Sequence, residues 1–270
     1  MLKTIQFALA LPFAIASLSA AAPARAQNAD RALLSTFCDA ANIKGSTCKR
    51  AKGYPDTGQR DCDVTLKADR SNGKFLASGN PLLVVNYDSG CESHATENGG
   101  VAVFEQAGGK NVFRGFVPGE RVNECVTLPK TAREDSLVCL NGHMGQGVLE
   151  SSVALMNFSE DAGKRIKIAD DVLLTAEDAT GAFGANVVTC KEHFKYFELS
   201  ELAAGPRPAT VVVDASYADT DLIKMVCTKG FPRPAEALGD PVPGDAFVPD
   251  GREKNRKFVI DLVTRKVTPQ

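Results

Sequence analysis

The sequence predicts an all-β fold: a propeller-like array of about four antiparallel blades of about three to four strands each, preceded by a short helix. From Cys62 onward, short runs rich in Val and Phe are separated by Gly, Asp and Asn, and no helical periodicity persists. These runs also recur as a strand–loop–strand–turn–strand unit of about 40–50 residues, the repeat length of propeller blades. The alternative is a two-sheet β-sandwich with an N-terminal helical cap.

Residues 1–26 are interpreted as a signal peptide. Lys3 supplies a positive start, an apolar stretch follows, and residues 24–26 offer a small-x-small cleavage site. Pro12 and Ser17 interrupt the apolar stretch, which argues against a membrane anchor. We therefore expect a periplasmic or secreted protein without a membrane span.

Removal of this segment would leave 244 residues with 29 basic and 33 acidic side chains, a net charge of −4. No block of basic residues stands out, so we expect no nucleic-acid partner. We divide this part of the chain into 27–62, a helix with a disulfide-rich loop, and 63–270, the β-repeat domain.

Residues 28–45 predict the one helix, because their apolar side chains fall on one stripe (Leu33, Leu34, Phe37 and Ala41). Asn28 or Asp30 can cap its start, and Gly45 is expected to end it. The polar segment 49–61 contains Gly and Pro and predicts a loop.

The repeat places three strands in each of four units. Opening strands are expected at 81–87, 135–142, 185–192 and 221–228. Second strands are expected at 100–106, 151–158, 194–202 and 256–263. Third strands are expected at 111–117, 164–174, 209–216 and 265–268. The opening strands are nearly continuous in Val, Leu and Ile, which predicts burial on both faces.

A propeller must also close its ring of blades. We therefore expect residues 63–69 to pair with a C-terminal strand such as 257–263. On this hypothesis, removal of 256–270 would unfold the whole domain.

Two short segments resemble a known repeat family. "AREDSLVC" at 132–139 and "YADTDLIKMV" at 217–226 resemble the D-x-D-L-x-V boundary of FG-GAP (integrin-type) propeller repeats, and "GNPLLVV" at 79–85 is a looser match. The resemblance covers 63–270 and implies a propeller. The Asp/Asn-rich calcium loop of many such repeats is missing, so calcium binding is not implied.

The chain is also similar to uncharacterised exported bacterial proteins that share a GCE-x-H…GG segment. This resemblance implies architecture and export but no activity. The segment consists here of Gly90, Cys91, Glu92, His94, Gly99 and Gly100.

An even number of cysteines in an exported chain predicts disulfides, because an oxidising compartment keeps thiols paired; free buried thiols are the alternative. Cys125 and Cys139 flank two apolar arms around a Pro-Lys-Thr turn, which would place them side by side on neighbouring strands. The other pairs that we expect are Cys38–Cys48, Cys62–Cys91 and Cys190–Cys227.

The three histidines lie 49 and 50 residues apart, each a few residues beyond an opening strand: His94, His143 and His193. Equivalent loops of a propeller converge on one face, so these imidazoles could form a zinc or copper site. Four nearby carboxylates could supply a further ligand or a general base: Asp88, Glu92, Glu97 and Glu192. The competing interpretation is that each histidine hydrogen-bonds its own turn. No other cofactor is predicted.

The sequence carries no motif of a known catalytic class, such as G-x-S-x-G or H-E-x-x-H. The glycine-rich stretch at 142–147 lacks the Lys-Ser/Thr of a phosphate loop, and it predicts a tight connection. We therefore hypothesise a binding module, not an enzyme, for an unknown protein or small ligand. The alternative is a metal-dependent hydrolase or oxidase that uses the three histidines.

Overall fold

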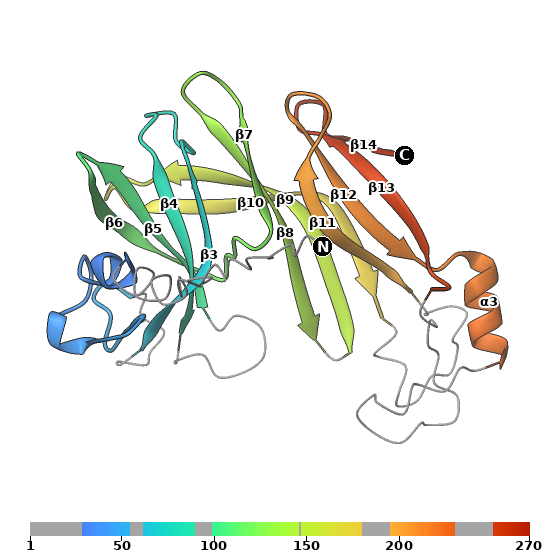
Figure 1. Ribbon diagram of the computed structural model, residues 1–270, viewed down its shortest axis with the longest axis horizontal. Helices are drawn as coiled ribbons and strands as arrows, with labels where there is room; N and C mark the ends of the chain where they lie inside the picture. The colour runs from blue at the N-terminus through green and yellow to red at the C-terminus, as the bar shows by residue number, and fades with distance from the viewer. Residues whose placement is uncertain (1–28, 55–61, 90–98, 146, 180–194, 230–250) are drawn as a thin grey trace, which may run out of the picture.

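The computed structural model describes residues 29–54, 62–89, 99–145, 147–179, 195–229 and 251–270. Within these ranges, fourteen strands form three antiparallel sheets, which confirms the all-β class (Figure 1). No helix in the described ranges is long and apolar enough to cross a membrane.

The first sheet has six strands, which follow one another in chain order: β1 (Ile43–Lys44), β2 (Thr47–Cys48), β3 (Val64–Gly73), β4 (Leu82–Ser89), β5 (Gly99–Ala107) and β6 (Lys110–Pro118). Its last three strands confirm the first predicted unit. The two central strands β4 and β5 are buried on both faces over most of their length, as their apolar runs predict.

The second sheet has four strands in the order β10-β9-β8-β7: β7 (Cys125–Pro129), β8 (Asp135–Gly145), β9 (Val148–Glu160) and β10 (Ile166–Asp178). It confirms the three strands of the second predicted unit and adds β7 at one edge. β10 lies beside β6 of the first sheet along one part and beside the third sheet along another.

The third sheet has four strands in chain order: β11 (Phe197–Ala204), β12 (Thr210–Tyr217), β13 (Lys254–Asp261) and β14 (Lys266–Pro269). These strands match the second and third strands of the last two predicted units, which therefore share one sheet. The opening strand expected at 185–192 lies outside the described residues.

The opening strand expected at 221–228 is wrong, because this segment forms the helix α3 (Thr220–Lys229). Asp219 caps the helix, since its carboxylate accepts a hydrogen bond from the Leu222 backbone N–H at 2.9 Å. Leu222 and Val226, one helical turn apart, pack on Ala179 in a small apolar cluster.

The three sheets pack face to face in series. One apolar core lies between the first and second sheets and includes Val84, Val103, Leu137, Cys139, Ala154 and Met156. A second core lies between the second and third sheets and includes Val138, Val153, Leu199, Val211, Val213 and Ile260. The second sheet is therefore buried on both of its faces.

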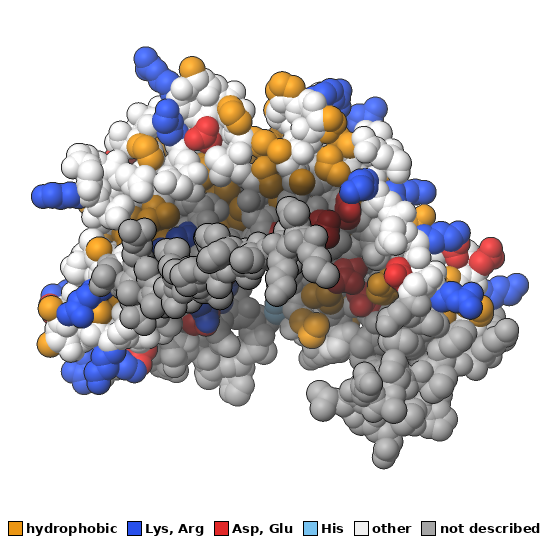
Figure 2. Space-filling model, viewed as in Figure 1, with side chains coloured by type: hydrophobic (Ala, Val, Ile, Leu, Met, Phe, Trp, Pro, Cys, Tyr) orange, Lys and Arg blue, Asp and Glu red, His pale blue; other side chains and the backbone are white. Residues whose placement is uncertain are grey.

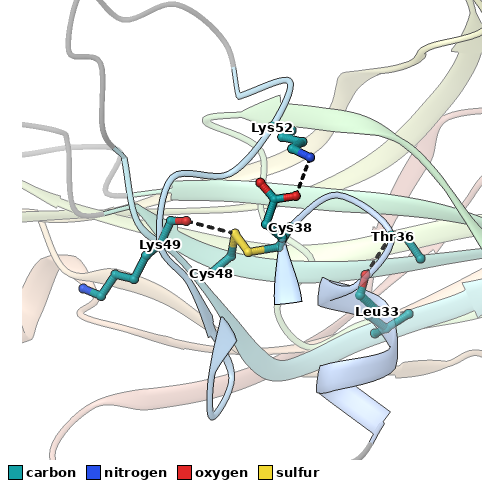
Figure 3. Close-up of a disulfide and its surroundings, with 7 residues drawn as sticks. Leu33, Thr36, Cys38, Cys48, Lys49 and Lys52 are labelled. Atoms are coloured by element: carbon teal, nitrogen blue, oxygen red, sulfur yellow. Dashed lines mark hydrogen bonds and ion pairs between the residues drawn. A yellow bond between two sulfur atoms is a disulfide. The ribbon is translucent and has the colours of Figure 1, made fainter. Parts of the chain in front are cut away.

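The N-terminal segment covers the remaining face of the first sheet. Residues 29–34 are helical, as predicted, but the helix does not reach Gly45, because a short 3-10 turn and the β1–β2 hairpin follow it. Its buried side chains pack on that face of the sheet: Leu33, Leu34 and Phe37 against Val85, Tyr87 and Phe104. Figure 3 shows how Cys38 and Cys48 join this segment to β2.

On the outer face of the third sheet, polar side chains flank Val212 and Val259, which lie opposite each other. Lys257 pairs with Asp214 at 2.8 Å, and Ser216 donates a hydrogen bond to Asn255 at 2.8 Å. The expected pairing of 63–69 with 257–263 is wrong, because β3 pairs with β2 and β4 and β13 pairs with β12 and β14.

Two of the expected disulfides are confirmed. Cys125 and Cys139 lie directly opposite each other on β7 and β8, with an S–S distance of 2.01 Å. Cys38 and Cys48 are bonded at 2.05 Å. Cys62 and Cys227 are disulfide-bonded too, but their expected partners, Cys91 and Cys190, lie outside the described residues.

Candidate functional site

A groove of about 1300 Å³ opens at the end of the sheets where β8 meets β9. Its walls come from β8, β9 and β10, from the connection between β6 and β7, and from the start of β11 and α3. Figure 2 shows acidic side chains gathered in the hollow between the two halves of the molecule. We call this feature the inter-sheet groove.

One wall of the inter-sheet groove is an ordered set of polar rows on the second sheet. His143, Glu150 and Glu177 lie directly opposite one another on β8, β9 and β10. Directly opposite residues of antiparallel strands project from the same face, so these three side chains form one row. The neighbouring row on that face is uncharged: Asn141, Ser152 and Thr175.

These rows continue the core between the first and second sheets. Two residues further along the strands, on the same face, Cys139 lies opposite Ala154, and both are buried in that core. The face therefore changes from apolar to uncharged polar to ionisable as the two sheets separate. This gradient is what turns the end of a packed interface into a groove.

The charge of the groove is partly compensated. Lys195 forms an ion pair with Glu177 at 2.7 Å. For Glu150 and Asp170, which also line the groove, no described residue supplies an ion pair or a side-chain hydrogen bond. Two carboxylates are thus open to a ligand.

The wall opposite the polar rows is the connection from β6 to β7, which a buried amide holds in place. The Asn86 side chain donates to Asn123 Oδ1 at 2.8 Å and accepts from the Val122 backbone N–H at 2.9 Å. Arg121 donates to the Tyr87 backbone carbonyl at 3.1 Å. This wall therefore moves with β4 and is not a free loop.

A smaller pocket of about 280 Å³ adjoins the groove on the third sheet. The two cavities share Tyr196, Phe197 and Ala218. The rest of the small pocket is formed by Tyr217, Arg256 and Phe258. We call it the aryl pocket, because four of its six residues are aromatic.

Of the three histidines, His143 lies on β8 in the wall of the inter-sheet groove. His94 and His193 lie outside the described residues, together with Glu92, Glu97 and Glu192. Asp88, the remaining candidate ligand, forms an ion pair with Lys67. The described part of the chain contains no cluster of three or more His, Cys, Asp or Glu side chains able to hold a metal ion. Convergence of the three histidines stays a prediction.

Several groove residues were not predicted from the sequence, above all Glu150, Asn141 and the aromatic side chains of the third sheet. Each follows an ordinary strand pattern, and its neighbours become visible only when strand register is known. One signal was available: the glycine-rich stretch at 142–147 marks the place where β8 turns into β9, and Gly145 lies opposite Val148.

No protein-family model, no curated protein and no solved structure matches this chain. The proposed function therefore depends on the chemistry of the inter-sheet groove.

Proposed function

We propose that this protein is an exported binding module that holds a ligand in the inter-sheet groove. The observation that carries the proposal is a groove of about 1300 Å³ with walls from the second and third sheets and from the connection between β6 and β7. Small-molecule sites usually occupy about 300–1,000 Å³. The groove is therefore suited to a ligand somewhat larger than a typical metabolite, such as a segment of a partner protein.

The polar groups of the groove favour a ligand that donates hydrogen bonds. Glu150 and Asp170 offer carboxylate oxygens that no described residue engages. The Oδ1 atom of Asn141 is buried and accepts no hydrogen bond from the described residues. An unsatisfied buried acceptor costs about 1–3 kcal/mol, and a ligand donor would recover part of it. Amino or guanidinium groups meet both requirements.

Export is part of the same proposal. Residues 1–26 have the composition of a signal peptide. The disulfides Cys38–Cys48 and Cys125–Cys139 support an oxidising compartment, because cytosolic thiols are kept reduced.

We further propose that the three sheets are consecutive blades of a propeller-like array, as the resemblance to FG-GAP repeats implies. The support is that successive sheets share an apolar core, first with second and second with third. A β-sandwich carrying an additional sheet is the alternative. In a propeller-like array the equivalent strand ends of all sheets approach a common axis, whereas in a β-sandwich with an additional sheet they do not.

The binding proposal is tested by filling the groove. In the variant Ser152→Trp a large ring occupies the uncharged row, whereas Val112→Trp places the same ring on β6 at an exposed side chain outside the groove. Both variants and the wild type are used to capture partners from the native envelope fraction, and native mass spectrometry of periplasmic protein detects small ligands.

We expect the Val112→Trp variant to retain the wild-type ligand and the Ser152→Trp variant to lose it. Melting temperatures establish that both variants are folded. Retention of the same ligand by Ser152→Trp would show that the groove is not the binding site.

The metal-dependent hydrolase or oxidase is kept as a second candidate, because His143 lies directly opposite Glu150 in the groove. Elemental analysis of protein purified from the periplasm tests it. Stoichiometric zinc or copper that disappears when His94, His143 and His193 are all replaced by Ala would support the enzyme. Metal-free protein would contradict it.

A further inference from the structure

The aryl pocket is the uncovered continuation of an apolar core. Val213 and Ala215 of β12 point toward the second sheet. On the neighbouring strand β13, Phe258 lies opposite Val213 and Arg256 lies opposite Ala215. Phe258 and Arg256 therefore project from the same face. Tyr217 follows Ala215 by two residues and shares this face, with Phe197 opposite it. Beyond the core the second sheet no longer covers this face, and the rings are half-exposed.

One positive charge stands at this pocket without a carboxylate. Arg256 lies over the ring of Tyr217, with its guanidinium carbon 5.4 Å from the ring centroid. Within the described ranges no Asp or Glu forms an ion pair with it. Lys254 on the same strand face is, by contrast, paired with Asp219. The guanidinium is thus held by the aromatic ring beneath it, while its hydrogen-bond donors stay open to a ligand.

The remaining rings form an apolar wall beside this cation. Phe197 and Phe258 meet edge to face, with ring centroids 6.0 Å apart. Aromatic pairs of this kind offer flat apolar surfaces at a fixed angle, against which another ring can pack. The volume of about 280 Å³ has room for about nine groups of the size of water, at ~30 Å³ each.

We propose that the aryl pocket binds a small aromatic carboxylate, whose ring packs between Phe197, Tyr217 and Phe258 and whose carboxylate is held by Arg256. A carboxylate matches the planar fork of a guanidinium, which can donate two parallel hydrogen bonds to it. Charge complementarity therefore selects an acid over an amine, and the volume selects one ring over two. The inference goes beyond the proposed function and does not depend on it, because the pocket and the polar rows lie on different sheets.

Three probes of nearly equal shape test the proposal: benzoate, benzyl alcohol and benzylamine. Binding to the mature protein with intact disulfides is measured by calorimetric titration and by saturation-transfer NMR. We expect benzoate to bind with a Kd of about 1 mM, as is usual for a ligand of this size. Benzyl alcohol should bind about tenfold more weakly, because it lacks the charge-assisted hydrogen bonds, and benzylamine should bind more weakly still.

Two variants and two controls locate the site. Arg256→Gln, at an exposed side chain, should reduce benzoate binding to the level of benzyl alcohol and leave benzyl alcohol unchanged. Tyr217→Leu should weaken both probes. Arg252→Gln removes a charge just before β13, away from the pocket, and should leave all affinities as in the wild type. Ser152→Trp should also retain benzoate, which separates this site from the inter-sheet groove.

Equal affinities for the three probes would overturn the proposal, since the guanidinium would then select nothing. Unchanged benzoate binding in Arg256→Gln or in Tyr217→Leu would also overturn it, because the acid would then bind elsewhere. Circular dichroism and melting temperatures confirm that each variant is folded before its affinities are compared.

Discussion

Arg114 shows how a single residue holds two sheets together. From β6 it forms ion pairs with Glu105 on β5 and with Glu160 at the end of β9, and it donates to the Lys164 backbone carbonyl at 2.8 Å. The side chains of Arg114 and Glu105 are 12% and 14% exposed. At this burial the carboxylate depends on its cation, because a buried charge without a partner is strongly unfavourable.

We expect Arg114→Met to lower the free energy of unfolding by about 3 kcal/mol, since it leaves Glu105 buried without its cation. Urea denaturation measures the change. Arg165→Met is the control, because Arg165 is 77% exposed and its partner Asp161 keeps hydrogen bonds from the backbone N–H groups of Gly163 and Arg165. Equal effects of the two substitutions would show that burial does not matter at Arg114.

A second residue gives a pH-dependent prediction. Burial raises the pKa of Glu198 above its ordinary value of 4.5, and the nearby charge of Asp178 raises this pKa further. The folded state therefore holds this proton more tightly than the unfolded state does. It follows that the charged carboxylate destabilises the fold above its raised pKa, and that this penalty is relieved as the pH falls toward the ordinary value.

Glu198→Gln should accordingly raise the melting temperature at neutral pH. The gain should shrink toward zero as the pH approaches the ordinary value of 4.5, where the wild-type carboxyl is protonated too. Thermal unfolding of both proteins across this pH range measures the difference. A gain that is constant with pH would contradict the assignment.

Gly99 and Gly100, at the end of the GCE-x-H…GG segment, have a packing role. A Cβ atom on Gly99 would lie 1.9 Å from the Tyr87 backbone carbonyl oxygen, and one on Gly100 would lie 2.3 Å from that of Val117. Strands β4, β5 and β6 can approach this closely only without those side chains. The absence of side chains at these two positions therefore has a structural explanation.

At the scale of elements, most strands were predictable, and so was pairing within a unit, but the register between strands was not. Alternating or continuous runs of apolar residues predict β4, β5, β8 and β9, because the pattern of apolar residues along a strand determines which of its faces is buried. The segment 221–228 is ambiguous, since a short apolar run suits a strand or a buried helix equally. Asp219 was the available signal: an acidic residue three positions before Leu222 predicts a helix start. Register across strands depends on distant residues, so the polar rows could not be foreseen.

The connection between β6 and β7 gives the prediction at this scale. Asn86 is 2% exposed, and its side chain hydrogen-bonds both the Val122 backbone N–H and the Asn123 amide oxygen. Asn86→Ala should cost about 2–3 kcal/mol, because it leaves a buried N–H and an amide oxygen without partners. Hydrogen exchange should show lost protection of the Val122 amide. Asn157→Ala, at an exposed side chain on β9, is the control and should leave that amide protected.

At the scale of the whole molecule, the two inter-sheet cores are separate clusters of side chains. The residues between the first and second sheets are not those between the second and third. Removal of 256–270 would unfold the whole domain if a ring closed through 63–69. Since β3 and β13 do not pair, we expect the effect of this removal to stay in the third sheet.

Removal of 256–270 takes away most of β13 and all of β14, and it uncovers Val211 and Val213. We expect the amides of β11 and β12 to lose protection in hydrogen-exchange mass spectrometry, while those of β4 and β5 keep it. The wild-type chain under the same conditions is the reference. Loss of protection in β4 and β5 as well would show that the three sheets unfold as one cooperative unit, as a closed ring would.

The two ends of the series of sheets are finished in different ways. A helical segment with a disulfide seals the first sheet, and the Asp214–Lys257 ion pair and its polar neighbours face water on the third. Among the described residues, neither end of the series of sheets has an exposed apolar face on which another molecule could add. The number of layers is thus set within one polypeptide, and raising the concentration should not make the assembly grow into filaments.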